Sequence, residues 1–420
     1  MAQMTAYLIH SFPLYSSTFV NDEIDEMRRQ GAKLALFSVQ RPGKGEYPEA
    51  FGRFARETAY VFPIDPARMF RRHLEALLRK PAAYCGCLGW ILVKPDLGIK
   101  KRLRSLFHFA EAVYLYPDLR ARGCGHVHVH FLLGGASIAL FLNRLYGLSY
   151  SLTAHGSDIF VDRVLQKEKL TYARFTRLAT EYNAAFLRKL VPEKVRATLH
   201  VIPFGIDRGN IPPKGEAGPA SARAPDAPVR ILAVGRLIWQ KAQHLLLEAC
   251  AQAQSGGFRF HLRIIGAGPL QADLEARIRS LGLEKQVTLA GAMDSKAVWS
   301  EYRNADVFVL SSVSEGSPFV IMEAMACGLP VIAPALHGIP EMIRDGADGR
   351  LFRTGSAESL GEALMALLGD PGERERLGRA AEASAAERFD QRRAVAAFHD
   401  LLRPWMPATE SLPALAGSLP

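Results

Sequence analysis

The chain has 420 residues, of which 49% are hydrophobic and 22% are charged. Its length is too great for a single hydrophobic core and predicts two domains, and its composition excludes a largely disordered protein. Five scattered cysteines are too few to build a disulfide framework.

The amino-terminal segment does not have the pattern of a signal peptide. Polar His10, Ser11 and Ser16 stand where such a peptide has an unbroken apolar core. The longest apolar stretch, residues 131–142, is shorter than the roughly 20 residues that cross a bilayer. We therefore expect a cytoplasmic protein, or one that lies against the inner face of the cytoplasmic membrane without spanning it.

The first half of the chain alternates apolar strand patterns with helical patterns, which predicts a parallel sheet with helices on both faces. The expected elements are strands at residues 6–10, 34–39, 127–129 and 149–153 and a helix at residues 19–30. His126, His128 and His130 alternate, so all three face one side of a strand. A strand end near a cleft and a metal site are both consistent with this spacing.

The second half repeats the pattern after a linker at residues 207–228, which is rich in proline, alanine and glycine. Residues 1–206 are therefore expected to form one domain and residues 229–387 another. The expected elements of the second are strands at 229–234, 260–265, 287–290, 307–310 and 330–333 and helices at 242–254, 270–280, 297–304 and 318–327. A helical segment at residues 388–403 is a candidate to return to the first domain, and residues 404–420 are expected to be a poorly ordered tail.

A glycine and two cations follow the first strand of the second half, at the strand end where open α/β sheets bind ligands. Gly235 and Arg236 come directly after the strand, and Lys241 lies five residues after Arg236. Cations beside a glycine that lets the backbone approach suit a diphosphate, whereas the alternative is a solvated basic turn.

A second group of residues opens the helix predicted at 318–327. Ser317 has the chemistry of an N-cap and Pro318 that of a first helical residue, so the helix is expected to point free N–H groups at the cleft. Glu315 precedes this helix and Glu323 lies in its second turn among apolar residues. A carboxylate in such surroundings needs a definite hydrogen-bonding partner.

Together these segments resemble, in order, the motifs of the retaining glycosyltransferases of family four. The segments are residues 153–158 (TAHGSD), 201–207 (VIPFGID), 235–241 (GRLIWQK), 266–269 (GAGP) and 315–323 (EGSPFVIME). Phe204 and Ala242 stand where the family has asparagine and glycine. The resemblance implies the GT-B fold, in which two Rossmann-like, doubly wound parallel-sheet domains face a cleft, and it covers most of the chain.

The resemblance also implies a role for each matching residue. Arg236 and Lys241 would bind the donor diphosphate, and Glu323 would hold the ribose hydroxyls. Glu315 and His155 would contact the transferred sugar and form the catalytic pair. Further donor-binding positions are Gly235, Gly266, Gly316, Ser317, Pro318 and Phe319.

Three more residues are candidates for the site. Asp158 belongs to the same loop as His155. Ser16 and Ser17 lie in a segment that resembles the first-strand loop of transferases that build bacterial surface polysaccharides, although those transferases usually have glutamate where Ser17 stands.

No Asp-x-Asp pair of the kind that holds a divalent ion is present. The nearest match, Glu23-Ile24-Asp25, lies on a predicted helix and is expected to be solvated. Two cations and a helix N-terminus can stabilise the leaving diphosphate in place of a metal. We therefore expect metal-independent transfer without a cofactor, and the resemblance implies retention of anomeric configuration.

The first half is strongly basic, because residues 1–206 hold 29 Lys and Arg against 17 Asp and Glu. Such an excess predicts an anionic partner. Nucleic-acid-binding motifs are absent from the sequence, so an anionic membrane carrying a lipid-linked glycan acceptor is favoured over nucleic acid, with a merely solvated surface as the alternative. The basic clusters and interleaved apolar residues are 71–72, 79–80, 100–104, Leu97, Ile99, Leu103, Leu106 and Phe107.

Two other functions remain open at this point. A UDP-sugar epimerase uses a similar two-domain cleft, and a protein that binds a nucleotide sugar without catalysis would carry the same donor motifs. Release of nucleoside diphosphate only when an acceptor is added would distinguish a transferase from both. The base, the sugar and the acceptor are not specified by any motif.

Overall fold

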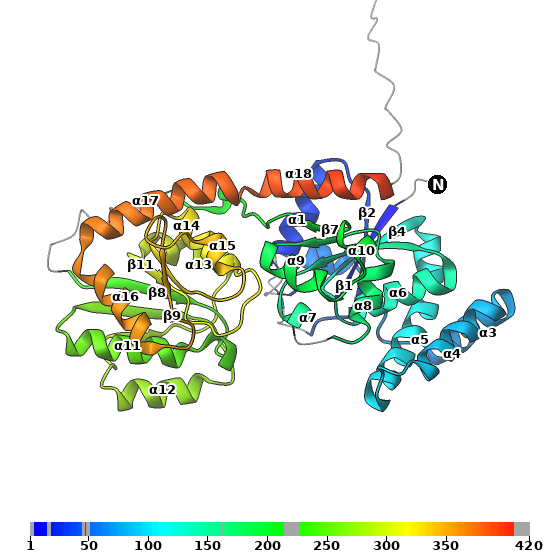
Figure 1. The fold of residues 1–420 in the computed structure, drawn as a ribbon, viewed down its shortest axis with the longest axis horizontal. Helices are drawn as coiled ribbons and strands as arrows, with labels where there is room; N and C mark the ends of the chain where they lie inside the picture. Colours follow the sequence, from blue (N-terminus) through cyan, green and yellow to red (C-terminus); the bar gives the residue numbers. More distant parts are fainter. Residues whose placement is uncertain are drawn as a thin grey trace, which may run out of the picture.

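The computed structural model describes residues 4–14, 18–43, 47, 51–160, 163–213 and 227–406. Two Rossmann-like halves lie side by side, each with a parallel sheet between layers of helices (Figure 1). The predicted fold class is therefore confirmed. Ser16 and Ser17 lie outside the described residues.

The sheet of the first half has seven strands within the described residues, in the order β3-β2-β1-β4-β5-β6-β7. Its strands are β1 Met4–Ser11, β2 Leu34–Gln40, β3 Ala59–Tyr60, β4 Cys124–His130, β5 Ser149–Ala154, β6 Thr176–Leu178 and β7 Leu199–Val201. The helices are α1 Thr18–Arg29, α2 Gly52–Glu57, α3 Pro66–Arg79, α4 Pro81–Val93, α5 Ile99–Ala121, α6 Gly134–Tyr146, α7 Ser157–Phe160, α8 Gln166–Tyr172, α9 Glu181–Arg188 and α10 Glu193–Arg196. Every pairing is parallel, so all the strand ends that carry loops toward a ligand meet at one edge.

The sheet of the second half has six strands in the described residues, in the order β10-β9-β8-β11-β12-β13. Its strands are β8 Val229–Val234, β9 Phe260–Ile265, β10 Val287–Leu289, β11 Val307–Val309, β12 Val331–Pro334 and β13 Arg350–Phe352. The helices are α11 Gln243–Ser255, α12 Gln271–Ser280, α13 Ser295–Asn304, α14 Phe319–Ala326, α15 Ile339–Met342, α16 Ala357–Gly369, α17 Pro371–Arg388 and α18 Gln391–Leu402. The order reverses between β8 and β11, and this is where a doubly wound sheet binds ligands.

The carboxyl-terminal helices run along both halves (Figure 1). The helix predicted at residues 388–403 is α18, which begins only at Gln391, because α17 ends at Arg388 and Asp390 caps α18 by accepting from the Arg393 N–H. Val395 and Phe398 of α18 are buried with Ile24 of α1 in one core cluster. The last helix thus packs on the first half although it follows the second.

The two helices next to the candidate site each begin one residue later than predicted. The helix predicted from Pro318 begins at Phe319, and Ser317 makes no capping hydrogen bond. The helix predicted from Ala242 begins at Gln243, because Ala242 has a left-handed backbone with φ of 46°. Glycine adopts this conformation without the steric cost of a β-carbon, which explains why glycine is usual at this position.

The three alternating histidines of β4 are buried, and two of them, His126 and His128, contact hydroxyl groups of β5. His126 contacts Ser149 and Ser151, with both ring nitrogens 2.8 Å from a hydroxyl oxygen. His128 contacts Ser151 and Thr153 in the same way, at 2.9 and 3.0 Å. Each ring is fully hydrogen-bonded, so the pair has a structural explanation, and only His130 lies at the end of the strand that faces the second half.

Acid is expected to destabilise the first half through His126. Burial lowers the pKa of this ring from 6.5 to about 3, so the folded protein holds it neutral. The unfolded chain takes up a proton below pH 6.5 and the folded one does not, so stability falls as the pH drops through this window. At about pH 5 the loss is about 2 kcal/mol.

Urea unfolding of the wild type and of His126→Gln at about pH 7.5 and about pH 5 measures this contribution. The variant should lose about 2 kcal/mol less than the wild type on acidification. Equal losses in the two proteins would show that His126 is not held neutral in the folded state.

Candidate functional site

The loops after β8 and β9 pack against each other at the edge of the second sheet. The Gly235 N–H donates to Ile265, and a β-carbon at Gly266 would overlap the Gly235 carbonyl oxygen. Gly266 has a φ of 145°, which side chains rarely permit. These two predicted glycines therefore bring the two backbones together and hold exposed Arg236 at the edge of the sheet.

Lys241 and Glu315, which are 74 residues apart, form an ion pair at the same edge. Lys241 Nζ lies 2.5 Å from Glu315 Oε1, which also accepts from the Ser312 hydroxyl at 2.6 Å. Both side chains of the ion pair are largely shielded from solvent, with 21% and 10% exposed. A cation predicted for a diphosphate and a carboxylate predicted for the attached sugar thus meet at one point, as a ligand spanning both would require. Ser312 was not predicted; its only signal is its place on the loop after β11.

The two halves touch at a pair of glycines. A β-carbon at Gly316 would overlap the carbonyl oxygen of His155 and Cα of Gly156, and one at Gly156 would overlap Cα of Gly316. Beside them the Phe319 ring stacks on Phe19 of α1, with centroids 4.6 Å apart. The start of α14 therefore lies directly against the His155 loop, so the structure brings these predicted site residues together.

The His155 ring is enclosed by aromatic side chains. It stacks on Phe204 with centroids 4.9 Å apart and an angle of 4°, and it also contacts Phe131. Its Nε2 lies 3.2 Å from Nδ1 of His130. Burial, together with His130 and Arg177, lowers the pKa of His155, so the ring is neutral and can act through hydrogen bonds but not as a cation.

Asp158 organises the backbone of the same loop. Its carboxylate accepts from the N–H groups of His155, Gly156 and Leu132, the last two at 2.6 and 2.8 Å. The side chain is only 1% exposed. Asp158 is therefore a positioning residue that sets the conformation of the His155 loop.

Glu23, which was expected to be solvated, is buried, and the prediction was wrong. Arg177 Nη1 donates to its carboxylate at 2.6 Å, and His130 Nε2 lies 3.1 Å from the other oxygen. Burial opposes the charge, but Arg177 and His130 outweigh it and lower the pKa of Glu23 to about 2. Arg177 is 154 residues away, so no local pattern could have shown this pair.

Glu323 has a hydrogen-bonding partner, as expected for a carboxylate in apolar surroundings. Its Oε2 accepts from the Tyr302 hydroxyl at 2.8 Å. Burial, opposed by this hydrogen bond and aided by the nearby Asp22 carboxylate, raises the pKa of Glu323 to about 7. Glu323 therefore changes charge near neutral pH, and Asp22 of α1 is a neighbour that the sequence did not indicate.

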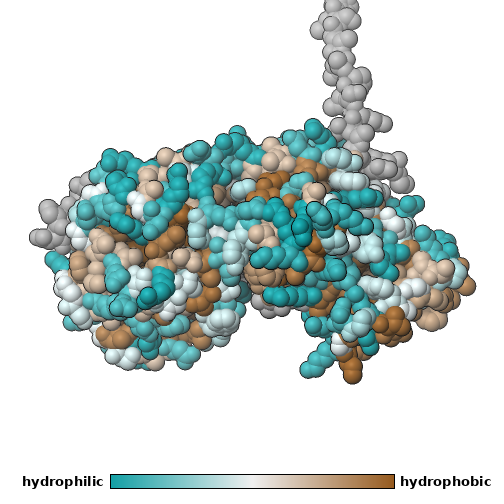
Figure 2. Space-filling view, in the orientation of Figure 1, coloured by the Kyte–Doolittle hydropathy of each residue, from teal (hydrophilic) through white to brown (hydrophobic). Residues whose placement is uncertain are grey.

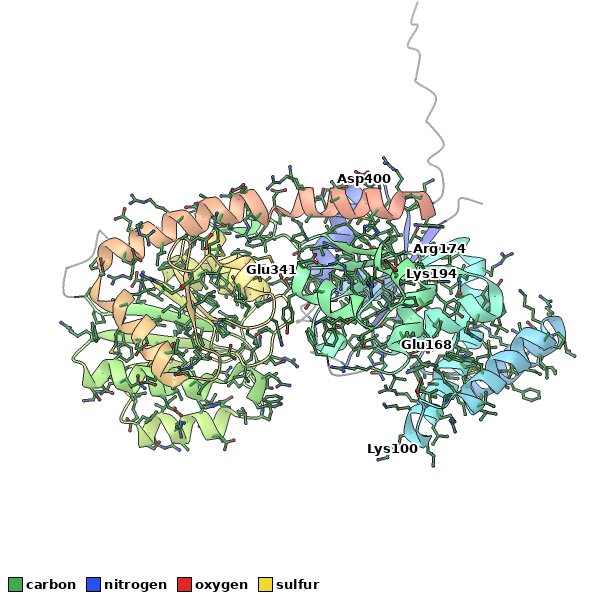
Figure 3. All side chains as sticks on the ribbon, viewed as in Figure 1. Lys100, Glu168, Arg174, Lys194, Glu341 and Asp400 are labelled. Atoms are coloured by element: carbon green, nitrogen blue, oxygen red, sulfur yellow. The ribbon has the colours of Figure 1, made fainter. Side chains whose placement is uncertain are left out.

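A second contact between the halves lies at Glu341. Its carboxylate accepts from the N–H groups of Glu181 and Tyr182 at the start of α9, both at 2.7 Å. An anion at a helix N-terminus is favourable, so this contact ties the second half to the first. Figure 3 shows Glu341 where the two halves meet.

Comparisons with known proteins decide the family. A family model described as "Glycosyl transferases group 1" matches residues 216–384. The putative colanic acid biosynthesis glycosyltransferase WcaL of Salmonella typhimurium is 34% identical over 378 residues, covering 86% of this chain and 89% of WcaL. The chain belongs to the group 1 glycosyltransferases. The resemblance inferred from the motifs is confirmed.

Further comparisons agree with this assignment. The amylovoran biosynthesis glycosyltransferase AmsK of Erwinia amylovora is 31% identical to the transferase over 382 residues, covering 85% of this chain and 88% of AmsK. The structure of HepE of Anabaena in complex with UDP superposes with a TM-score of 0.71 at 16% identity, covering 96% of this chain and all of HepE. Sucrose-phosphate synthase of Thermosynechococcus elongatus gives a TM-score of 0.73 at 18% identity, covering 96% and 99%. These structures show the shared GT-B fold.

Two features are absent from the part of the transferase that the structure describes. Over the described ranges, no three or more histidine, cysteine, aspartate or glutamate side chains are grouped so that they could hold a metal ion. In the same part of the chain, no helix is both long and apolar enough to cross a membrane.

Proposed function

We propose that the transferase moves a sugar, with retention of configuration and without a metal, from a nucleoside diphosphate to a glycan acceptor. The observation that carries the proposal is the pairing of Lys241 with Glu315 directly beside the glycine contact between the two halves. Diphosphate, sugar and acceptor would then meet where the second half faces His155.

The proposed roles follow from the chemistry of each group. Negative charge grows on the leaving diphosphate, and Lys241 and Arg236 would stabilise it together with the N–H groups at the start of α14. Glu315, held by Lys241 and Ser312, would orient the sugar rather than attack it. The neutral His155 ring would hydrogen-bond to the sugar near the reacting carbon, with the acceptor attacking the same face that the diphosphate leaves.

The proposed donor is a UDP-sugar and the proposed acceptor a lipid-linked glycan of surface polysaccharide synthesis. The similarity to WcaL and AmsK, whose names refer to colanic acid and amylovoran, supports the acceptor class. The fold shared with HepE, which was solved with UDP, supports the donor class. The transferase would then work at the inner face of the cytoplasmic membrane.

Nucleoside diphosphate release tests the proposal. The protein is mixed with UDP-, GDP- and ADP-sugars, with and without a lipid extract that contains glycan acceptors, in the presence and absence of EDTA. We expect release that requires acceptor and survives EDTA, with the anomeric configuration of the product, read by NMR, unchanged from the donor. Conversion of the donor sugar without acceptor would indicate an epimerase, and binding without turnover would indicate a non-catalytic protein.

Removing either of the two basic side chains proposed to bind the diphosphate should lower kcat/KM for the donor. We expect Arg236→Ala and Lys241→Ala each to lower kcat/KM about 10- to 150-fold, which corresponds to about 1.5–3 kcal/mol, the size of a lost charge-assisted hydrogen bond. The loss should be larger for Lys241, because the shielded Glu315 carboxylate is then left without a cation and keeps only the Ser312 hydroxyl. Arg259→Ala is the matched control, since this exposed arginine precedes β9 at the opposite end of the sheet. Wild-type kinetics in both site variants would refute the phosphate assignment.

Glu315 and Glu323 should affect different parts of the donor. Glu315→Gln is expected to impair transfer while leaving nucleoside diphosphate affinity nearly unchanged. Because the pKa of Glu323 is about 7, nucleotide affinity should fall about tenfold from about pH 8 to about pH 6, as its carboxylate is protonated.

Calorimetry with the bare nucleoside diphosphate separates these effects. In Glu323→Gln the affinity should be lower and should keep only the pH dependence of the ligand phosphate itself. Equal affinity losses in Glu315→Gln and Glu323→Gln would remove the distinction between sugar and ribose roles.

A further inference from the structure

Exposed apolar side chains gather on one part of the first half. Of the twelve large apolar side chains that are exposed in the described residues, nine lie between residues 70 and 107, so they form a local surface rather than scattered exceptions. We call this surface the apolar ridge. It consists of Phe70, Leu74, Leu77 and Leu78 of α3, Leu92 and Val93 of α4, and Ile99, Leu103 and Phe107 of α5. Figure 2 shows hydrophobic colour along the lower right edge of the molecule, over these helices.

The ridge is the outer face of helices that are already packed on their inner faces. Arg72 and Ala76 of α3 and Cys87 and Ile91 of α4 are buried, while ridge residues such as Ile99 are up to 77% exposed. Ridge residues recur every three or four positions on α3 and every four on α5, so each of these two helices presents one apolar stripe, and Leu92 and Val93 extend the surface at the end of α4. An apolar surface of this extent on a folded protein marks an interaction site.

The sequence expectation for this region needs one correction. Leu97 was assigned to an exposed apolar face, but it is only 4% exposed and belongs to the core. Arg102 is half-buried and donates to the Lys94 carbonyl, so it supports the loop before α5. The exposed apolar side chains of α3 and α4, in contrast, were not expected from the sequence.

The charges around the ridge decide what covers it. Residues 66–107 contain ten Lys and Arg but only two Asp and Glu. A second copy of the chain would set this excess against itself, which is unfavourable in a self-complementary interface. An anionic bilayer surface attracts the cations and accepts the apolar side chains.

A cavity of about 160 Å³ lies beside the ridge, between the start of α5 and the segment before α8. Its charged lining residues are two acidic ones, Asp96 and Glu168, and four basic ones, Lys94, Lys101, Arg163 and Lys167. Lys94 is paired with Glu168 at 2.6 Å, which leaves the cavity basic overall. The cavity adjoins the ridge, because Lys94 comes directly after Val93 and Lys101 lies two residues after Ile99. A phosphate of a lipid headgroup fits this chemistry.

We propose that the apolar ridge docks the transferase on an anionic phospholipid bilayer and that the adjoining basic cavity receives a headgroup phosphate. The ridge lies at the end of the first half that is remote from the second half, so docking leaves the contact between the halves uncovered (Figure 1). This inference deepens the proposed function, in which the acceptor is lipid-linked, but its test does not depend on catalysis.

Vesicle flotation of the full chain tests the proposal, with phosphatidylglycerol-rich vesicles and pure phosphatidylcholine vesicles as probes. We expect the wild type to float with the anionic vesicles at low salt and to be released at about 0.5 M salt. A ridge variant replaces four of the most exposed side chains by serine, namely Phe70→Ser, Leu78→Ser, Val93→Ser and Ile99→Ser. Its partition should fall at least about tenfold, while its thermal unfolding stays unchanged because the side chains are exposed.

A charge variant and a matched control test the basic residues. Lys100→Gln, Lys101→Gln and Lys167→Gln together should weaken partition on the order of 100-fold, because each cation near an anionic surface contributes about fivefold. The control changes the same number of exposed lysines away from the ridge and should float like the wild type. These are Lys194→Gln, Lys285→Gln and Lys296→Gln. Figure 3 shows Lys100 at the tip of the first half and Lys194 away from it.

Several results would overturn the proposal. These are a wild type that stays soluble with both vesicles, equal flotation with neutral vesicles, and wild-type flotation of the ridge or the charge variant. A dimer in light scattering that becomes a monomer in the ridge variant, without flotation, would assign the surface to a second copy. Turnover of the donor by the wild type with a water-soluble acceptor separates membrane docking from the proposed transfer. A wild type that floats with anionic vesicles but shows no turnover would refute only the proposed function.

Discussion

Gly316→Ala is expected to lower kcat/KM of the transferase about 100- to 1000-fold, which corresponds to about 3–4 kcal/mol. The added β-carbon would overlap the His155 carbonyl oxygen and Cα of Gly156, both of which are backbone atoms that cannot rotate away. The halves must therefore separate by more than a fraction of an ångström. Because a misplacement of about 1 Å between reacting groups costs about 100-fold, the effect on transfer should be large.

The folded state should tolerate this change. Both sheets keep their cores, so thermal unfolding of Gly316→Ala should stay close to that of the wild type. Gly52→Ala is a suitable control, because a β-carbon there would meet only the flexible Arg56 side chain at 3.4 Å. Full turnover in Gly316→Ala would mean that the glycine contact is not part of the working arrangement of the two halves.

Arg177→Met should destabilise the first half by about 3–5 kcal/mol, the cost of leaving a buried charge without its partner. The Arg177 side chain is 1% exposed and pairs with Glu23. It also donates to the carbonyl groups of Ile202 and Pro203, where the chain leaves the first half. Its guanidinium lies 4.7 Å from the ring centroid of Phe398 on α18. The Arg177 side chain thus contacts α1, the segment at Ile202 and Pro203, and α18.

The pH dependence of this loss identifies its cause. The pKa of Glu23 is about 2 in the folded protein against an ordinary value of 4.5, so the pair contributes stability above about pH 4.5 and loses it as the pH falls toward 2. The difference between wild type and Arg177→Met should shrink in this window. Adding Glu23→Leu should recover part of the loss, because an apolar replacement of both partners removes the buried charge.

Arg174→Met is the matched control for Arg177. Arg174, which Figure 3 labels, is exposed and lies three residues earlier. Its guanidinium lies over the Trp405 ring, 4.7 Å from the centroid. We expect a loss below about 1 kcal/mol, as for exposed interactions in general. An equally large loss of unfolding free energy in Arg174→Met and Arg177→Met would show that burial of the Arg177–Glu23 ion pair does not explain the effect.

Most of the fold could be predicted from local pattern. The alternation of strands and helices, the linker and the order of the motifs identified two doubly wound sheets, because each depends on residues close together in the chain. Element ends were less accurate. The break between Arg388 and Gln391 follows from the Asp390 cap. Ser317 has the chemistry of a cap, but the N-cap position of α14 falls on Pro318.

The sequence by itself determined which residues follow the strands of the second half, and hence Gly235, Lys241, Glu315 and Glu323 as candidates, because a strand's end is a local property. Only the tertiary structure decided their partners. Lys241 meets Glu315 over 74 residues and Arg177 meets Glu23 over 154, and such pairs depend on how sheets and helices pack. The apolar ridge has the same origin: α3 and α4 contain many apolar residues, but only packing against α5 and α6 decides which of these side chains are buried and which face outward.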